Sequence, residues 1–268
     1  MSGPKGGEES LLGNQRGEVI AGATLRTDAW WIEQLLVVLV LGGFGVYATW
    51  AALVNAHYYA APYLSPFYSP CLAANCQHVT LPLIGSWWNL SPAFLILWVP
   101  GGFRATCYYY RKAYYRSFFA DPLACAVGEA RKGYRGETAF PFILQNLHRY
   151  FLYAALIILI FLWWDVFRAF TFGGHFGLGL GSLAILTSTA TLTLYTFSCH
   201  SLRHIVGGSL DCFSCAVAGG PRRRTWALVS VLNEHHMGWA WGSLFAVCFA
   251  DLYVRLCSMG IWRDFRLF

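Results

Sequence analysis

The chain has 268 residues, of which 57% are hydrophobic and 12% charged, and its formal net charge is +6. Soluble domains carry about 25% charged residues, so this composition excludes an ordinary soluble domain. The basic residues stand in loops between apolar runs rather than on one soluble face, which argues against nucleic-acid binding. The 12 Trp and 15 Tyr suit a protein with two membrane interfaces, where amphipathic rings gather.

Residues 1–29 are polar and contain no cleavage site before the first apolar run, so they are predicted to form a cytoplasmic N-terminal tail. Residues 30–268 are predicted to form one membrane domain. A helix of about 20 apolar residues crosses a hydrocarbon core of about 30 Å. Five segments are suitable, namely approximately 30–54, 87–108 (interrupted by Pro100, Gly101 and Gly102), 150–170, 176–204 and 237–255. The predicted fold class is therefore all-α, an integral membrane bundle of five transmembrane helices.

The distribution of Lys and Arg predicts the orientation, because short cytoplasmic loops retain basic residues. Segment 104–149 carries eight basic residues, and Arg203 and residues 222–224 follow the fourth apolar segment. Segment 55–86 has no Lys or Arg. We therefore expect the N-terminus to lie in the cytoplasm and the C-terminus outside.

This orientation brings most of the histidines to the cytoplasmic face. Five of the eight stand at segment ends there: His148, His200, His204, His235 and His236. Cys107 and Cys199 stand at the same level, and Cys125 lies in a cytoplasmic loop. Imidazole and thiolate are the ligands of haem iron and iron–sulfur clusters, so the pattern predicts a redox metal.

His200 and His204 are four residues apart and are expected on one helical face. They could hold one iron together, or one could be the ligand and the other a hydrogen-bond donor behind it. The lone C-x-x-C of Cys212 and Cys215 is a weak metal signal. Cys71 and Cys76 fall on the outer side, where a disulfide can form.

Several other polar residues stand near membrane boundaries. Arg104 and Tyr108 are candidates for binding a quinone, although Arg104 could equally extend its side chain to the lipid headgroups. Asp165 and Asp251 fall near the outer ends of their helices, and we expect both to be solvated. The basic and aromatic segment 111–149 is expected to dock a partner or, alternatively, to attract anionic lipid headgroups.

Four stretches of the sequence resemble one family. They are FRATCYYYRKAYYRSFFADPLACAVGE (103–129), FPFILQNLHRYFLY (140–153), YTFSCHSLRHIVGG (195–208) and YVRLCSMGIW (253–262). They are similar to the membrane anchor of actinobacterial succinate dehydrogenase, of the single-anchor type found in mycobacteria. The resemblance implies a bacterial plasma-membrane subunit that partners a flavoprotein subunit and an iron–sulfur subunit, and that delivers electrons to quinone. The dehydrogenase active site would then belong to another subunit.

This branch of the family is associated with a Rieske-type [2Fe–2S] cluster, held by two cysteines and two histidines. The resemblance thus implies thiolate ligands from among Cys107, Cys125 and Cys199, and imidazole ligands from among His148, His200 and His204, with His236 in reserve. Histidine in place of thiolate raises the potential of such a cluster, which draws electrons toward the membrane.

Three alternatives remain open from the sequence. A b-type anchor would hold haem between His148 and His200 or His204. A transporter would be favoured by inverted repeats or by charged residues at mid-membrane, and we find neither. A purely structural tether would leave the histidines of the cytoplasmic face without a role.

Overall fold

The computed structural model describes residues 20–71, 91–120, 122–129, 138–140 and 142–268. The chain divides into two compact units, of residues 1–47 with 104–146 and of residues 48–103 with 147–268. Most of the predicted N-terminal tail, the start of the second expected span and Cys76 lie outside the described residues.

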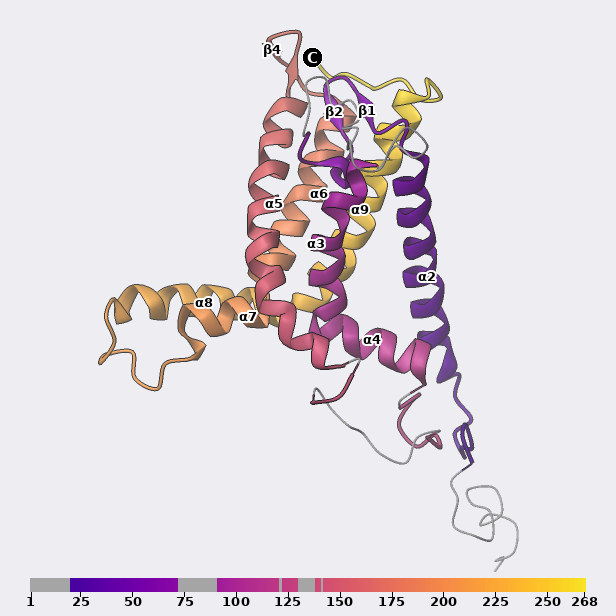
Figure 1. The fold of residues 1–268 in the computed structure, drawn as a ribbon, viewed down its shortest axis with the longest axis vertical. Coiled ribbons are helices and arrows are strands. Elements are labelled where there is room, and N and C mark those ends of the chain that lie inside the picture. Colours follow the sequence, from indigo (N-terminus) through magenta and orange to yellow (C-terminus); the bar gives the residue numbers. More distant parts are fainter. Residues whose placement is uncertain (1–19, 72–90, 121, 130–137, 141) are drawn as a thin grey trace, which may run out of the picture. The chain divides into compact units, whose positions relative to one another are not determined.

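The described elements are overwhelmingly helical, as the sequence predicts. In chain order they are α2 (Trp31–Val54), β1 (Tyr59–Ala60), β2 (Tyr63–Leu64), the 3-10 turn η1 (Pro66–Tyr68), α3 (Pro92–Thr106), α4 (Tyr108–Phe119), the 3-10 segment η4 (Phe142–Leu147), α5 (His148–Ala169), β3 (Thr171–Phe172), β4 (His175–Phe176), α6 (Leu180–Phe197), α7 (His200–Arg203), the π-helical η5 (His204–Gly208), α8 (Gly219–Glu234) and α9 (His236–Ser258) (Figure 1). The strands form two antiparallel hairpins, β1 with β2 and β3 with β4.

Four segments of the described chain are long and apolar enough to cross a membrane: Trp31–Val54, Phe142–Ala169, Leu180–Phe197 and His236–Ser258. The second expected span corresponds to α3, a shorter apolar helix of 15 residues. Pro100 lies inside α3 instead of ending it. Membrane helices tolerate an internal proline because neighbouring groups satisfy the backbone it leaves unpaired.

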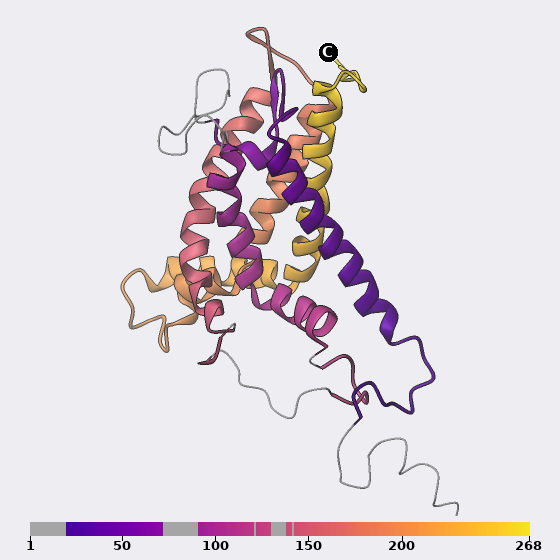
Figure 2. The same cartoon turned by 45° about the vertical axis from the view of Figure 1, so that its right-hand side comes forward.

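Helices α5, α6 and α9 run side by side in the second unit (Figures 1 and 2). Part of α3 also packs against α5, and Gly102 makes this approach possible. A Cβ at Gly102 would lie 2.2 Å from Cε1 of Phe151, so a larger side chain would collide with that ring. The Trp98 ring meets Phe151 edge-on, with 6.1 Å between centroids.

A buried ion pair closes the end of this unit opposite the α7–α8 segment. Asp251 is fully buried, and Arg255 donates to it from Nε at 2.8 Å and to the carbonyl oxygens of Ala51 and Ala56 at 3.0 and 2.7 Å. The Ser65 hydroxyl also donates to Asp251. The expected solvation of Asp251 is therefore wrong, because the segment after α2 folds over the carboxylate.

The expected solvation of Asp165 is wrong for the same reason. Its side chain is buried, and one carboxylate oxygen accepts a hydrogen bond from the Ser69 hydroxyl. Burying a carboxylate destabilises the folded protein unless donors of this kind hydrogen-bond to it. The segment that carries Ser65 and Ser69 thus covers both acidic residues of this end.

Hydrogen bonds to Asp264 hold the C-terminal segment at the same end of the second unit. Its carboxylate accepts from the hydroxyls of Tyr63 and Tyr253 at 2.6 and 2.8 Å and from the Gly181 N–H at 3.1 Å. A Cβ at Gly181 would lie 2.5 Å from the Tyr63 ring. Glycine is therefore needed where α6 begins against this tyrosine.

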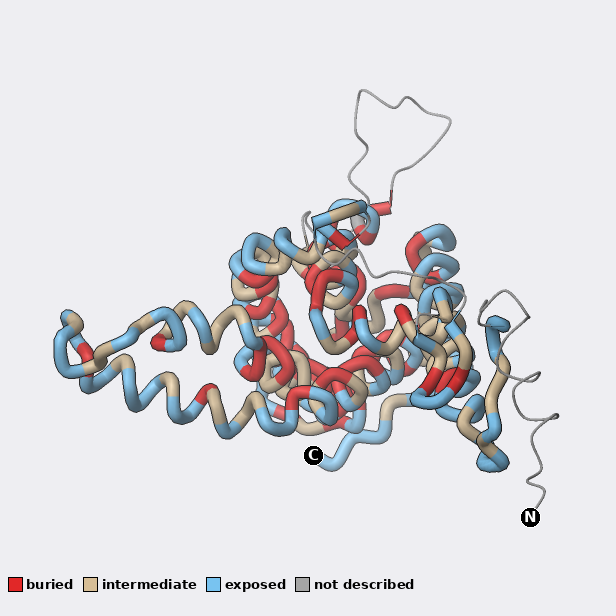
Figure 3. Tube along the Cα trace, turned by 90° about the horizontal axis from the view of Figure 1, so that it is seen from below, coloured by how far each residue is buried: buried red, intermediate tan, exposed pale blue. Residues whose placement is uncertain are grey.

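Helix α6 ends at Phe197, earlier than the predicted end of the fourth span near His204. The extended backbone of Cys199 (φ −66°, ψ 138°) stops the helix and starts α7 in a new direction. Helix α8, which the sequence did not predict, then runs crosswise to α5, α6 and α9 near their end and projects sideways from them (Figures 1 and 2). Figure 3 shows that the α7–α8 segment is mostly exposed.

The first unit contains α4, which occupies the start of the expected docking segment. Arg111 on this helix is only 8% exposed. Its guanidinium lies over the rings of Tyr108 and Phe142, at 5.1 and 5.6 Å from their centroids. Arg111 is therefore a packed residue and not the docking-surface residue that its charge suggested.

Candidate functional site

A histidine and a cysteine that are far apart in sequence meet near the end of the second unit that carries α7 and α8. His148 is the first residue of α5, and Cys199 is the residue between α6 and α7. Nε2 of His148 lies 3.0 Å from Sγ of Cys199. Two of the six predicted metal ligands are thus brought into direct contact.

The break between α6 and α7 positions the sulfur. Cys199 is the N-cap of α7, and its Sγ accepts a hydrogen bond from the Ser201 N–H at 3.3 Å. The thiolate is the form of cysteine that binds metal. The Phe103 ring stacks on His148 with 4.7 Å between centroids, which holds the imidazole in one orientation.

His236, the reserve ligand of the sequence analysis, lies beside this pair. It is buried at the start of α9, and its ring stacks on Tyr195 with 5.1 Å between centroids. Its Nδ1 lies 2.6 Å from Oγ of Ser198, which in turn donates to the Tyr195 carbonyl at 2.9 Å. When the Ser198 proton goes to the Tyr195 carbonyl, Nδ1 of His236 donates to Ser198 and Nε2 carries the lone pair.

His200 and His204 take different positions. The His200 ring is 5.9 Å from that of His236, so it belongs to the same cluster. Partial burial, and then the charge of Arg203, lower the pKa of His200, which favours the neutral imidazole. His204 is exposed at the start of η5. His200 lies on α7 and His204 begins η5, so neither is on the membrane-spanning helix α6, which ends before Cys199.

Cys107 and Cys125 belong to the first unit. Cys107 is buried between α3 and α4, where its carbonyl oxygen accepts from the Arg111 N–H at 2.8 Å. Cys125 is exposed, and its carbonyl oxygen accepts from Nη1 of Arg26 at 3.0 Å. Neither cysteine takes part in a disulfide.

The donor types suit an iron site, but the described residues contain no group of three or more His, Cys, Asp or Glu side chains that could hold a metal ion. In the second unit, the described cluster offers one sulfur, from Cys199, and three imidazoles, from His148, His200 and His236. A site with two thiolates would need a second cysteine beside Cys199.

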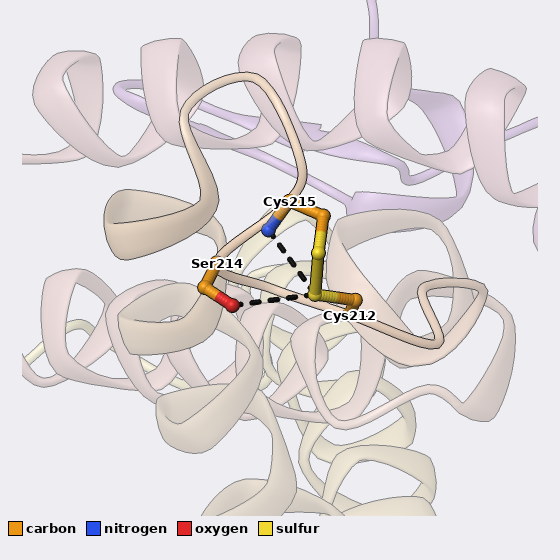
Figure 4. Close-up of a disulfide and its surroundings, with 3 residues drawn as sticks. All are labelled: Cys212, Ser214 and Cys215. Atoms are coloured by element: carbon orange, nitrogen blue, oxygen red, sulfur yellow. Dashed lines mark hydrogen bonds between the residues drawn. A yellow bond between two sulfur atoms is a disulfide. The ribbon is translucent and has the colours of Figure 1, made fainter.

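The remaining cysteine pairs are oxidised. Cys212 and Cys215 form a disulfide, with the Cys215 N–H donating to Sγ of Cys212 at 3.2 Å (Figure 4). A disulfide sulfur is not a thiolate ligand, so this C-x-x-C is not arranged as a metal site. Cys71 is also disulfide-bonded, and its expected partner Cys76 lies outside the described residues.

The two candidate quinone residues face different neighbours. Nη1 of Arg104 donates to the Tyr110 hydroxyl at 2.6 Å. Burial raises the pKa of Tyr110 to about 12, so the phenol stays neutral and can accept this bond. Tyr108 is 61% exposed, and its ring lies under the guanidinium of Arg111.

His236 was only the reserve ligand of the sequence analysis, and its contact with Ser198 was not predicted. The signal was present, because the His235–His236 pair stands at the start of the last apolar segment. Its contact with the α6–α7 break could not be seen along the chain, since Ser198 lies 38 residues earlier.

Comparison with known proteins gives two matches. A family model described as "Actinobacterial succinate dehydrogenase subunit SdhC" matches residues 32–260, well over half of the chain. A chain of the solved structure "Mycobacterium smegmatis Sdh1 complex in the apo form" is 42% identical, with a TM-score of 0.83. The match covers 95% of this chain and 97% of that one. No curated protein matches.

Proposed function

Because the chain belongs to the family of actinobacterial succinate dehydrogenase subunit SdhC, we propose that it anchors such a complex and passes electrons to quinone. The contact between His148 and Cys199 is the observation that carries the electron-transfer role. It places a thiol and an imidazole, two side chains that can bind iron, together in a chain with membrane-spanning helices. A tether without a redox role would not need that pair.

The partners follow from the same membership. The similar chain is part of an Sdh1 complex, and the flavoprotein and iron–sulfur subunits are the proposed partners of this one. We place the protein in the bacterial plasma membrane with the N-terminus in the cytoplasm, on the distribution of Lys and Arg. Helix α3 would supply the remaining one of the five proposed spans.

The proposed redox centre is a Rieske-type [2Fe–2S] cluster. Cys199 and His148 would be two of its ligands, with a second imidazole from His200, His204 or His236 and a second thiolate from Cys107 or Cys125. When bound, such a group supplies a one-electron relay at a higher potential than an all-cysteine cluster. The chain's own contribution is orientation: Phe103 fixes the ring of His148, and the Ser201 N–H is directed at the sulfur of Cys199.

Spectroscopy of the purified complex tests the identity of the centre. We expect an electron paramagnetic resonance signal of Rieske type in addition to those of the soluble iron–sulfur subunit. The optical spectrum of the reduced complex should lack the sharp bands of haem b. Haem bands with no additional cluster signal would assign the histidines to haem and overturn the cluster. If neither centre is found, the chain acts as a tether.

The proposed quinone site includes Arg104 and Tyr108. A quinone carbonyl needs a hydrogen-bond donor, and Arg104 stands at the end of the apolar helix α3, where its guanidinium is already oriented by Tyr110. The exposed ring of Tyr108 would add a flat aromatic wall.

Replacing Arg104 by alanine is expected to lower quinone reduction by about tenfold or more, since a bond to a charged donor contributes about 1.5–3 kcal/mol. Succinate oxidation with a soluble dye should be unchanged, because that step needs no quinone. Arg104→Lys, which keeps a charged donor, should retain part of the activity. Equal loss of both activities in Arg104→Ala would indicate misassembly and count against the quinone role.

A further inference from the structure

A cavity of about 360 Å³ lies along α4 in the first unit. Its wall includes Arg111, Lys112, Arg116, Tyr108, Tyr115 and Glu129. Of the described residues that line it, three are cations and one is a carboxylate. The volume is within the range of about 300–1,000 Å³ typical of small-molecule sites. The excess of positive charge favours an anionic ligand.

The central cation of this cavity is held in place by its neighbours. Arg111 is 8% exposed, and its guanidinium is packed against the rings of Tyr108, Tyr115 and Phe142, at 5.1, 6.0 and 5.6 Å from their centroids. A planar guanidinium that is already ordered loses little freedom when it binds a phosphate or carboxylate. Lys112 and Arg116 stand beside it on the same helix and can reach the same ligand.

The wall of the cavity is hydrogen-bonded to the start of α2, a helix long and apolar enough to span a membrane. Pro122 and Glu129 of the lining belong to segment 122–129. Within that segment the Leu123 carbonyl accepts from Nε2 of Gln34 on α2 at 2.6 Å. The Gly128 N–H donates to the Ala23 carbonyl at 2.8 Å, just before α2 begins.

Beyond this point α2 presents an apolar surface. Ile32, Leu35, Leu36 and Leu39 are 44–59% exposed, although all are aliphatic. Side chains of this kind on a membrane helix suit contact with acyl chains. The first unit therefore contains both a basic cavity and an exposed aliphatic helix surface, which matches a ligand with an anionic head and apolar tails.

We propose that the α4 cavity binds the phosphate of an anionic glycerophospholipid, whose acyl chains lie along the exposed aliphatic side of α2. Arg111, Lys112 and Arg116 hold the phosphate, and Tyr108 and Tyr115 form the apolar part of the wall. An acidic protein surface would meet the cations but would leave the aliphatic residues of α2 uncovered. None of the described residues that line the cavity belongs to the cluster of His148 and Cys199.

The test uses the whole complex, purified in a neutral detergent and titrated with dioleoyl phosphatidylglycerol. The affinity is measured by native mass spectrometry for the parent complex and for the variant Lys112→Gln/Arg116→Gln. Arg111 is left in place because it is packed in the core of its unit. The matched control, Arg223→Gln/Arg224→Gln, removes two charges from the exposed part of α8.

We expect about 30-fold weaker binding in the cavity variant, because each basic residue at an anionic headgroup contributes about fivefold. The control variant should bind the lipid like the parent. Dioleoyl phosphatidylcholine should bind the parent complex much more weakly, and inorganic phosphate at the same concentration should not displace phosphatidylglycerol.

Each other outcome overturns the proposal. Equal lipid affinity in the cavity variant and the control variant would show that the cavity does not bind the lipid. Displacement by inorganic phosphate would assign it to a free anion. If the cavity variant releases the soluble subunits while its lipid affinity is unchanged, the cations bind an acidic surface of a partner.

Discussion

Replacing Cys199 by serine is expected to lower quinone reduction by about 100-fold or more, while dye-linked succinate oxidation persists. Loss of even an outer hydrogen-bond partner of a metal ligand typically costs about 10–100-fold in metal affinity or activity, and loss of a ligand costs at least as much. Serine keeps the size of the side chain and its place before α7, so the fold should be retained. The proposed loss is specific to electron transfer, because succinate oxidation is assigned to another subunit.

The measurements are iron content, the Rieske-type resonance and the two activities of the purified complex. His148→Ala should have the same effect, since Nε2 of His148 lies 3.0 Å from the sulfur. Cys248→Ser is the matched control, because Cys248 is a half-buried cysteine of α9 away from the cluster. Iron content and resonance that stay at the parent level in Cys199→Ser would rule out Cys199 as a ligand.

Replacing Arg255 by methionine is expected to lower the free energy of unfolding by about 3–5 kcal/mol, because it leaves the carboxylate of Asp251 buried without its charged partner. The variant also loses the two donors that hold the carbonyl oxygens of Ala51 and Ala56. Both side chains of the pair are at most 1% exposed, so water cannot replace these bonds.

A double variant separates the ion pair from the rest of the packing. Asp251→Leu/Arg255→Met removes both charges, and replacing a buried pair by apolar residues is often neutral or stabilising. We expect it to unfold at a higher temperature than Arg255→Met alone. Thermal unfolding of the purified protein in one detergent provides the comparison. If Arg255→Met unfolds like the parent protein, the carboxylate of Asp251 does not depend on Arg255 in the folded state.

The membrane character of the chain could be predicted from its sequence because it is a local property. Hydrophobicity accumulates within one segment of about 20 residues, without reference to any other part of the chain. The segments beginning near 30, 150, 176 and 237 correspond to α2, α5, α6 and α9. The second expected span is represented by α3, whose expected first residues lie outside the described part of the chain.

The sequence could also name the residue types of the candidate site, but not which of them meet. His148 and Cys199 are 51 residues apart, and only the packing of α5 against α6 brings their side chains together. The role of Ser198 is equally hidden, because its contact with His236 crosses from the end of α6 to the start of α9. Spacing along one helix had favoured His204, which the fold leaves exposed.

The sequence by itself determined that this is a helical membrane protein of the SdhC family with histidine and cysteine at the ends of its helices, because composition and motifs are carried by neighbouring residues. Only the tertiary structure decided which charges are buried. Asp251 was expected in contact with water and Arg111 in contact with a partner, yet each is packed inside its unit. Burial depends on which distant segments cover a side chain. The sequence of segment 51–69 does not indicate that it covers Asp165 and Asp251.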